Sequence, residues 1–147
     1  MPPGARSSRH IRELLQVHVR TIMKDHLITA APDDQLVNVA LEIAAHGIGA
    51  VPVVDADEQL VGIVSSTELV QLLHDGVKLE DRPVSSVMGP VPASIDEFAT
   101  VNEAIGLMRK EAVRHLPVTR EGKLVGLVTA SALIRHLLKN YPSPEVA

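Results

Sequence analysis

The chain has 147 residues and no cysteine. This absence excludes a disulfide framework, a cysteine-ligated zinc or iron–sulfur site and a cysteine nucleophile. Aromatic residues are also scarce, because Phe98 and Tyr141 are the only two and tryptophan is absent. We therefore do not expect the chain to bind single-stranded nucleic acid by stacking bases on aromatic rings.

Long apolar segments are missing as well. A membrane-spanning helix needs a run of about 18 apolar residues, and the sequence contains none. The first twenty residues lack the apolar region of a secretory signal, so a cytoplasmic location is expected. The apolar fraction of 46% is nevertheless high enough to build a folded core. The length suits one compact domain or two small ones.

Charge is distributed unevenly along an acidic chain of net charge −4. Residues 19–80 contain three basic and ten acidic side chains, whereas residues 81–141 contain eight basic and six acidic ones. An anionic ligand would therefore be steered toward the second half. The acidity of the whole chain argues against a nucleic-acid partner.

The sequence contains one internal repeat. Residues 19–73 align with residues 84–137 at an offset of 65, which becomes 64 after the loop that follows Asp55. Neither repeat alone can bury much of its surface. We therefore expect the two repeats to pack on each other about a pseudo-twofold axis and to leave two related clefts between them. The identical pairs are Val19/Val84, Met23/Met88, Pro52/Pro117, Val53/Val118, Leu60/Leu124, Val61/Val125, Gly62/Gly126, Val64/Val128, Leu69/Leu133 and Leu73/Leu137.

Each repeat predicts the order strand, helix, strand, strand, helix. In the first repeat we expect strands at 27–31, 51–54 and 60–64, and helices from a cap at Asp33 or Asp34 to His46 and over 66–74. Gly47 suits the position after the first of these helices. In the second repeat, Thr100 and Glu103 form a capping box that opens a helix through residue 111. Strands at 116–119 and 124–128 and a helix over 130–139 follow, so the fold class is mixed α/β (α+β).

The two ends lie outside the repeat. Ile11, Leu14, Leu15 and His18 follow helical spacing, so residues 6–20 predict a helix, with Ser7 or Ser8 as its cap. This helix would cover the repeat pair or a partner subunit. We therefore divide the chain into an N-terminal extension at 1–18, repeats at 19–80 and 81–141, and a disordered tail at 142–147.

Two motifs recur in both repeats. Residues 50–54 read A-V-P-V-V and residues 60–65 read L-V-G-I-V-S, and the second repeat has H-L-P-V-T at 115–119 and L-V-G-L-V-T at 124–129. Each repeat also opens with a valine, and an apolar residue and a methionine follow three and four positions later, at 19–23 and 84–88. Together these motifs closely resemble a tandem pair of cystathionine-β-synthase (CBS) domains, also called a Bateman module, over about residues 19–140.

The resemblance implies a regulatory module and not an enzyme. Members of this family form β-α-β-β-α units that pair within the chain and often dimerise, here as a homodimer. Many bind AMP, ADP or ATP in the clefts between repeats, and S-adenosylmethionine and NAD are further adenosine-containing candidates. No obligatory cofactor is implied, and the signal would pass to an unidentified effector protein.

The family pattern for gripping a ribose is G-h-x-[ST]-x-x-[DN], where h is apolar. The first repeat departs from it with Glu68 at the acidic position, and the second repeat has Ala132 there. A glutamate can still accept from a ribose diol, whereas alanine cannot, so this contact is expected in at most one cleft. Ser65 and Glu68 also form a capping box, so the carboxylate has an alternative, structural role.

The remaining ligand candidates have structural alternatives too. Arg114 and His115 align with a basic pair that contacts phosphate in some family members, but they equally suit an exposed arginine and a half-buried histidine. Ser65, Thr67, Thr129 and Ser131 stand at helix starts, where they would cap the helix or bind phosphate. The positions that align with the adenine pocket of the family are ordinary strand and core residues: Thr29, Ile48, Ala50, Pro52, Ser94, Val113 and Pro117.

The sequence bears on two other classes of function besides a nucleotide sensor. A structural dimerisation module without a small ligand is favoured by Ala132 and by the glutamate at position 68. Catalysis has no support, because the sequence contains neither a Walker phosphate loop nor a Gly-x-Ser-x-Gly elbow. The histidines show no spacing typical of a metal site, so no metal is predicted.

Overall fold

The computed structural model describes residues 10–139 and 141. Residues 10–15 are helical and precede the short 3-10 helix η1. The order of elements confirms a mixed α+β fold. After η1 (Val19–Thr21) come α2 (Leu36–His46), β1 (Ala50–Val54), β2 (Leu60–Ser65), α3 (Ser66–His74), η2 (Val84–Ser86), β3 (Ile95–Asp96), α4 (Val101–Glu111), β4 (His115–Arg120), β5 (Lys123–Thr129) and α5 (Ala130–Leu137).

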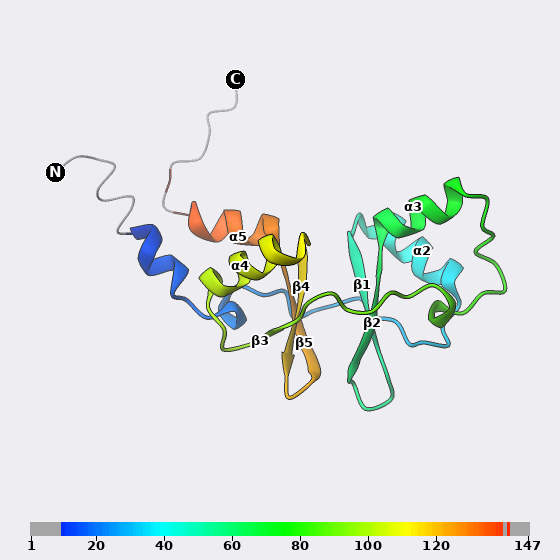
Figure 1. Ribbon diagram of the computed structural model, residues 1–147, viewed down its shortest axis with the longest axis horizontal. Coiled ribbons are helices and arrows are strands. Elements are labelled where there is room, and N and C mark those ends of the chain that lie inside the picture. The colour runs from blue at the N-terminus through cyan, green and yellow to red at the C-terminus, as the bar shows by residue number, and fades with distance from the viewer. Residues whose placement is uncertain (1–9, 140, 142–147) are drawn as a thin grey trace, which may run out of the picture.

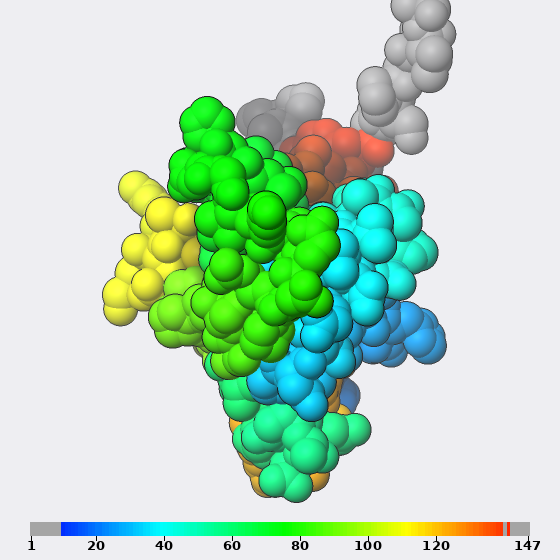
Figure 2. Space-filling view, turned by 90° about the vertical axis from the view of Figure 1, so that its right-hand side faces the viewer, coloured from blue at the N-terminus to red at the C-terminus, as the bar shows by residue number. Residues whose placement is uncertain are grey.

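Two antiparallel hairpins stand side by side at the centre of the molecule (Figure 1). The β1–β2 hairpin carries α2 and α3 on its outer side, and the β4–β5 hairpin, to which the two-residue β3 adds in parallel, carries α4 and α5. The tips of the hairpins are joined, because Leu60 N donates to Gly122 O at 3.2 Å and Leu124 N donates to Glu58 O at 3.2 Å. The teal and orange tips therefore lie together at the bottom of Figure 2.

The repeats exchange their leading segments. Val84, which begins the second repeat, is fully buried in the core of the first, and Val19, which begins the first, is fully buried in the core of the second. Backbone bonds hold both in place: Val84 N donates to Asp34 O at 2.8 Å, and Val19 N donates to Ala99 O at 2.8 Å. Each apolar core is thus completed by the other repeat, which ties the two halves together.

Glycines in the central hairpins make room for the methionines of the exchanged segments. The side chain of Met88 packs over Gly62, where a β-carbon would lie 2.8 Å from its Sδ, and Met23 packs in the same way over Gly126. Directly after these methionines, the backbones of Lys24 and Leu127 exchange two hydrogen bonds of 2.9 Å. The glycines are shared by both repeats because each admits a methionine from the opposite repeat.

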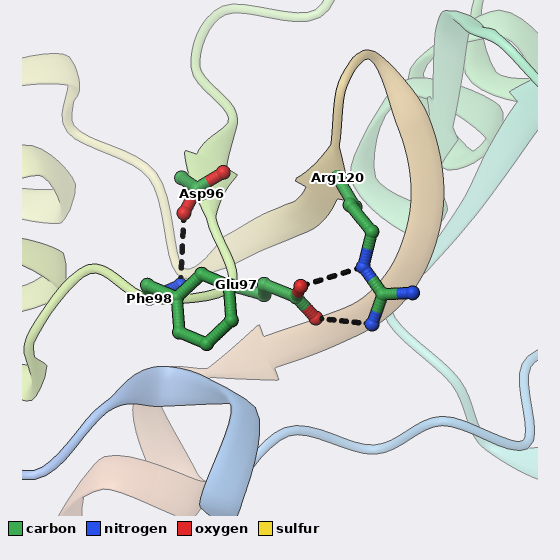
Figure 3. A network of polar contacts seen from close by, with 4 residues as sticks. All are labelled: Asp96, Glu97, Phe98 and Arg120. Atoms are coloured by element: carbon green, nitrogen blue, oxygen red, sulfur yellow. Dashed lines mark hydrogen bonds and ion pairs between the residues drawn. The ribbon is translucent and has the colours of Figure 1, made fainter.

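A bidentate ion pair fixes the end of β3 to the end of β4 (Figure 3). Glu97, only 2% exposed, accepts from Arg120 Nε at 2.6 Å and from Arg120 Nη2 at 2.9 Å. Arg20 adds the N-terminal segment, because its backbone N donates to Glu97 O at 3.1 Å and its guanidinium lies 4.9 Å from the ring centre of Phe98. The first repeat has no such ion pair. The positions that align with Asp96, Glu97 and Arg120 are Ala31, Pro32 and Asp55 there, so the glutamate and the arginine are both missing.

The local predictions for the helices after the hairpins and for two helix ends are confirmed. Helix α3 has the expected bounds, and Thr100 Oγ1 accepts from Glu103 N at 3.1 Å at the start of α4. Gly47 follows α2 in the left-handed conformation with φ 61°. The four central strands have the expected positions, with ends that differ by one residue in most cases.

Two predictions in the first repeat are wrong. No strand forms at 27–31, where only Ala30 makes a bridge, to Val53. Neither Asp33 nor Asp34 caps α2, whose cap position is Gln35 without a side-chain bond. The Asp34 carboxylate instead accepts from Ala31 N at 2.8 Å. Its carbonyl accepts from Val84 N, so the exchanged segment of the second repeat determines the path of the chain here.

The predicted N-terminal helix is also wrong beyond residue 15. Val17 O accepts from Val101 N at 2.8 Å, which draws the chain out of the helix and onto α4. His136 in α5 lies 3.0 Å from Leu14 O through Nε2, so the segment packs on the second repeat. Ser7, Ser8 and the predicted tail at 142–147 lie outside the described residues.

Candidate functional site

A cleft of about 830 Å³ opens between the two repeats. One wall is the start of α3, with residues 65–68, and the opposite wall is residues 112–115 at the start of β4. The segment 89–93 and the start of α5 close the remaining sides. This first cleft therefore combines the chain immediately after β2 with the chain immediately before β4.

Glu68 supplies the carboxylate of the first cleft. Ser65 Oγ accepts from Glu68 N at 3.1 Å and donates to Glu68 Oε1 at 2.9 Å. The N-cap role of Ser65 is thus confirmed, and the Glu68 carboxylate accepts from the hydroxyl of Ser65. The same contacts hold the exposed carboxylate at the rim of the cleft, where its Oε2 faces Gly89. Contact with a ribose stays a prediction.

Arg114 and His115 approach the first cleft from the other repeat. Arg114 is exposed, and its carbonyl accepts from Ala130 N at 3.0 Å, which fixes the backbone beside the start of α5. His115 is half-buried, and this burial, together with the charge of Arg114, lowers the pKa of its imidazole below the ordinary value of 6.5. The arginine is the permanent cation of the pair, and the imidazole of His115 is a weaker base than an ordinary histidine side chain.

The four helix-start hydroxyls differ in role. Ser65 and Thr129 are the caps of α3 and α5, and Thr129 Oγ1 accepts from Ala132 N at 3.1 Å. Thr67 and Ser131 lie within the first turn of these helices and make no capping bond, so a capping role for them is wrong. Both line the first cleft, beside backbone N–H groups of the helix start.

A second cleft of about 530 Å³ lies next to the first. Its walls are residues 24 and 26–28 of the leading segment, residues 46–50 and the start of α5. His115, Thr129 and Ser131 line both clefts, together with Gly49 and Ala50. The imidazole of His115 stands against Gly49, so this ring is a wall that the two clefts share.

The predicted site residues divide between the clefts. Ile48 and Pro52 line only the second cleft, while their repeat partners Val113 and Pro117 line the first. Thr29 lines a hollow beside α2 with Gln35, and the exposed Ser94 belongs to neither cleft. The residues that the first cleft brings together are Ala50, Ser65, Thr67, Glu68, Val113, Arg114, His115, Pro117, Thr129 and Ser131.

Sequence reasoning missed the leading segments as cleft walls. Residues 89–93 line the first cleft except for position 91, and Lys24 and His26 line the second. The signal was present, because Lys24 and Gly89 directly follow the aligned methionines 23 and 88. The cations of the second cleft that lie outside the motifs, such as Arg135, had no such signal.

Within residues 10–139 and 141, no three histidine or acidic side chains are arranged to hold a metal ion. None of the helices in this part of the chain has both the length and the apolar character needed to cross a membrane.

Comparison with known proteins places the chain among CBS-domain proteins. The family model described as the CBS domain matches residues 19–75 and 84–139. A CBS domain-containing protein of Dictyostelium discoideum is 38% identical over 138 residues, which cover 85% of this chain and 94% of that protein. An uncharacterized protein of Methanopyrus kandleri is 29% identical over 81% of this chain, and the match spans 62% of its length.

A solved structure shares the same arrangement. The crystal structure of CBSX2 in complex with AMP superposes with a TM-score of 0.74 and 26% sequence identity, covering 83% of this chain and 96% of that one. The two segments matched by the CBS family model, residues 19–75 and 84–139, correspond to the two halves of the fold that exchange their leading valines and methionines. The chain therefore belongs to the CBS domain family and carries two CBS domains in tandem.

Proposed function

We propose that this chain is a regulatory module that binds an adenine nucleotide in the first cleft. The observation that carries the proposal is the pairing of Glu68 from one repeat with Arg114 and His115 from the other around one cavity. A nucleotide has a diol that a carboxylate can accept from and a phosphate that a guanidinium can bind. The AMP complex of CBSX2 supports this class of ligand for a related fold.

The walls of the cleft suit the parts of such a ligand. Glu68 would accept from the ribose hydroxyls, and Arg114, His115 and the hydroxyls of Thr67 and Ser131 would hold phosphate. Ala50, Val113 and Pro117 offer apolar surface for the base. The volume of about 830 Å³ falls within the usual range of small-molecule sites, roughly 300–1,000 Å³.

Regulation would follow from the position of the ligand between the repeats. A nucleotide that touches Glu68 and Arg114 together gains its full binding energy only at one relative placement of the two repeats. Binding would therefore shift the population of inter-repeat arrangements, and so the surface seen by an effector protein. We expect the module to act in the cytoplasm as a homodimer and to catalyse no reaction.

A ligand-free dimerisation module is the second candidate function. Apolar side chains remain exposed on the helices of both repeats, among them Leu41 on α2, Leu73 on α3 and Ile134 on α5. The first of these is 62% exposed. Exposed apolar patches are typical of surfaces that bind another protein chain, and Glu68 already has a structural partner in Ser65.

Ligand-dependent melting separates the two functions. The melting temperature is measured with AMP, ADP, ATP, S-adenosylmethionine and NAD, for the natural chain, Arg114→Ala and Arg109→Ala. A ligand at 100 times its Kd stabilises by about 2.7 kcal/mol. The sensor predicts a shift with one adenosine ligand that Arg114→Ala reduces. Arg109→Ala, which removes an exposed cation of α4 outside the cleft, leaves the shift unchanged.

The opposite outcome is equally clear. No shift with any of the five ligands contradicts the sensor and favours the dimerisation module, which is then examined by its mass in solution. Chromatography of the nucleotide after incubation tests the absence of catalysis, and we expect the ligand to be recovered unchanged.

A further inference from the structure

Two methionines pack the exchanged leading segments against the opposite repeats. Met88 packs on the apolar core of the first repeat, and Met23 packs on that of the second. Figure 1 shows the segments that carry them, in green and blue, running between the two halves of the molecule. The chain has four methionines and no cysteine, so the thioether is its only form of sulfur. A peroxide-type oxidant therefore has methionine as its principal target in this protein.

Met23 and Met88 differ from Met108 in their access to solvent. Both are half-buried, and the next residue of each segment lines a cleft, Lys24 the second and Gly89 the first. Met108 is only 8% exposed within the core of the second repeat. We therefore expect a small oxidant in solution to reach the two half-buried methionines before the buried one.

The two half-buried sulfur atoms are packed closely against backbone. A β-carbon built on Gly62 would lie 2.8 Å from Met88 Sδ and 3.2 Å from Gly89 O. Gly126 lies against Met23 Sδ in the same way. On the side of each glycine there is thus no room for an oxygen atom added to the sulfur. The carbonyl oxygen nearby cannot bind a sulfoxide oxygen, because both are hydrogen-bond acceptors.

The neighbouring backbone N–H groups are already engaged. Ile63 N donates to Gly89 O at 3.3 Å and Gly89 N donates to Ile63 O at 3.2 Å, so the residue after Met88 is bonded twice to the central hairpin. The backbones of Lys24 and Leu127 form the equivalent pair after the other methionine. A sulfoxide oxygen is a strong acceptor and finds no free donor among these four groups, so it has to turn to water.

We propose that Met23 and Met88 are oxidation sites through which a peroxide-type oxidant releases the exchanged leading segments. In the reaction, the O–O bond of the peroxide breaks and one of its oxygen atoms bonds to Sδ. The thioether loses two electrons, and the peroxide is reduced to water or to an alcohol. The polar sulfoxide no longer suits the apolar contact with glycine, so the side chain leaves its place and the backbone pair that follows it weakens.

Release of the segments would change both clefts. The wall at Gly89 faces the Glu68 carboxylate of the first cleft, and Lys24 belongs to the wall of the second. The bonds after Met88 are 3.2 and 3.3 Å long, whereas those after Met23 are 2.9 Å, so the first cleft should open more readily. The oxidation needs no nucleotide in either cleft, so the proposal stands apart from the proposed function.

Peroxide treatment of the folded chain without nucleotide tests the proposal. Hydrogen peroxide is added to the natural chain, and peptide mass mapping follows the gain of one oxygen at each methionine with time. We expect Met23 and Met88 to be oxidised faster than Met108. The melting temperature should then fall by about 5 °C or more, the shift expected when side-chain packing is lost in a domain of this size. Treatment with methionine sulfoxide reductases should restore it.

Leucine variants identify the methionines that act. Leucine replaces methionine at similar volume and cannot be oxidised, so Met23→Leu/Met88→Leu is expected to melt like the natural chain before treatment. After peroxide, this double variant should keep its melting temperature. Met108→Leu is the matched control and should lose as much as the natural chain. Each of the single variants Met23→Leu and Met88→Leu should lose less than the natural chain, which provides the test if the double variant does not fold.

The proposal is overturned if Met23 and Met88 are oxidised no faster than Met108, or if their sulfoxides form without lowering the melting temperature. It is also overturned if the double variant loses as much stability in peroxide as the natural chain does. Failure of the proposed function has a different signature, because an absence of nucleotide binding would leave all of these results unchanged.

Discussion

The imidazole of His115 occupies the space beside Gly49 that a side chain would need. A β-carbon built on Gly49 would lie 2.5 Å from His115 Nε2 and 2.8 Å from Cε1. His115 begins β4 and Gly49 directly precedes β1 of the opposite repeat, and both residues line both clefts. This contact is therefore where the first repeat, the second repeat and the two cavities meet.

Gly49→Ala is expected to destabilise the fold. The added methyl group forces the half-buried ring of His115 out of its position, and overpacking of this kind costs about 1–3 kcal/mol. Urea unfolding at neutral pH measures the loss. The double variant Gly49→Ala/His115→Ala removes the ring that collides, so it should be more stable than the sum of the two single effects implies. Additive effects would show that the contact between the two residues is not the cause.

Gly106→Ala should have the opposite sign. Gly106 is exposed in the middle of α4, and a β-carbon there would meet nothing within 4 Å. Alanine in a helix interior is favoured over glycine by about 1 kcal/mol. Thermal and urea unfolding should therefore show a gain in stability. A loss would mean that this face of α4 is covered, for example by a second copy of the chain in solution.

The elements that could be predicted are those fixed by local sequence. The alternating and β-branched runs around Pro52 and Pro117 gave the central hairpins, and the capping patterns at Ser65 and Thr100 gave the helix starts. The strand predicted at 27–31 is wrong, because the apolar residues of this segment do not form a strand ladder. Its path depends on Val84, whose backbone N–H bonds Asp34 O from the opposite repeat.

The candidate site shows the same division. The sequence predicts the chemistry of Glu68, Arg114 and His115, and the fold places all three on one cleft. The sequence could not assign equivalent positions such as Ile48 and Val113 to one cleft or the other, because an alignment of the two repeats places both residues at the same position. A twofold arrangement puts them in different cavities. Arg135 could not be predicted as a site residue, because it belongs to no motif and only the fold brings it to the second cleft.

The ion pair of Glu97 and Arg120 should respond unequally to loss of its two partners. Arg120 has a side chain that is 63% exposed, whereas the Glu97 side chain is 2% exposed. Arg120→Met leaves a buried carboxylate without its partner, so it should lower the melting temperature strongly. Glu97→Gln lets the arginine turn to water and keeps a buried group that can accept a hydrogen bond, so its effect should be smaller. The double variant Glu97→Gln/Arg120→Met should be more stable than Arg120→Met alone, because it leaves no buried carboxylate without a partner. Equal effects of the two single substitutions would contradict this account.

The same pair makes stability depend on pH in the acid range. The hydrogen bond from Arg120 holds the pKa of Glu97 in the folded chain below its ordinary value of 4.5. As the pH falls below 4.5, the unfolded chain takes up a proton that the folded chain does not, so the folded state loses stability. The contribution is fully present above this pH and disappears as the pH falls through the folded-state pKa. Urea midpoints from neutral pH into this range should fall less steeply for Glu97→Gln than for the natural chain. Glu111→Gln, an exposed carboxylate at the end of α4, should leave the slope nearly unchanged.

The N-terminal segment is expected to stabilise the fold of its own chain and not a dimer. Leu14 is 6% exposed, and its carbonyl lies 3.0 Å from His136 Nε2 in α5. Leu14→Ala should therefore cost about 2–5 kcal/mol, as for other buried leucines. The loss should be the same at every protein concentration, because packing within one chain does not depend on mass action. Leu41→Ala is the matched control, since Leu41 is 62% exposed on α2 and should change the stability of a monomer little. A destabilisation by Leu14→Ala that is present at high protein concentration and disappears on dilution would assign the segment to a subunit interface instead.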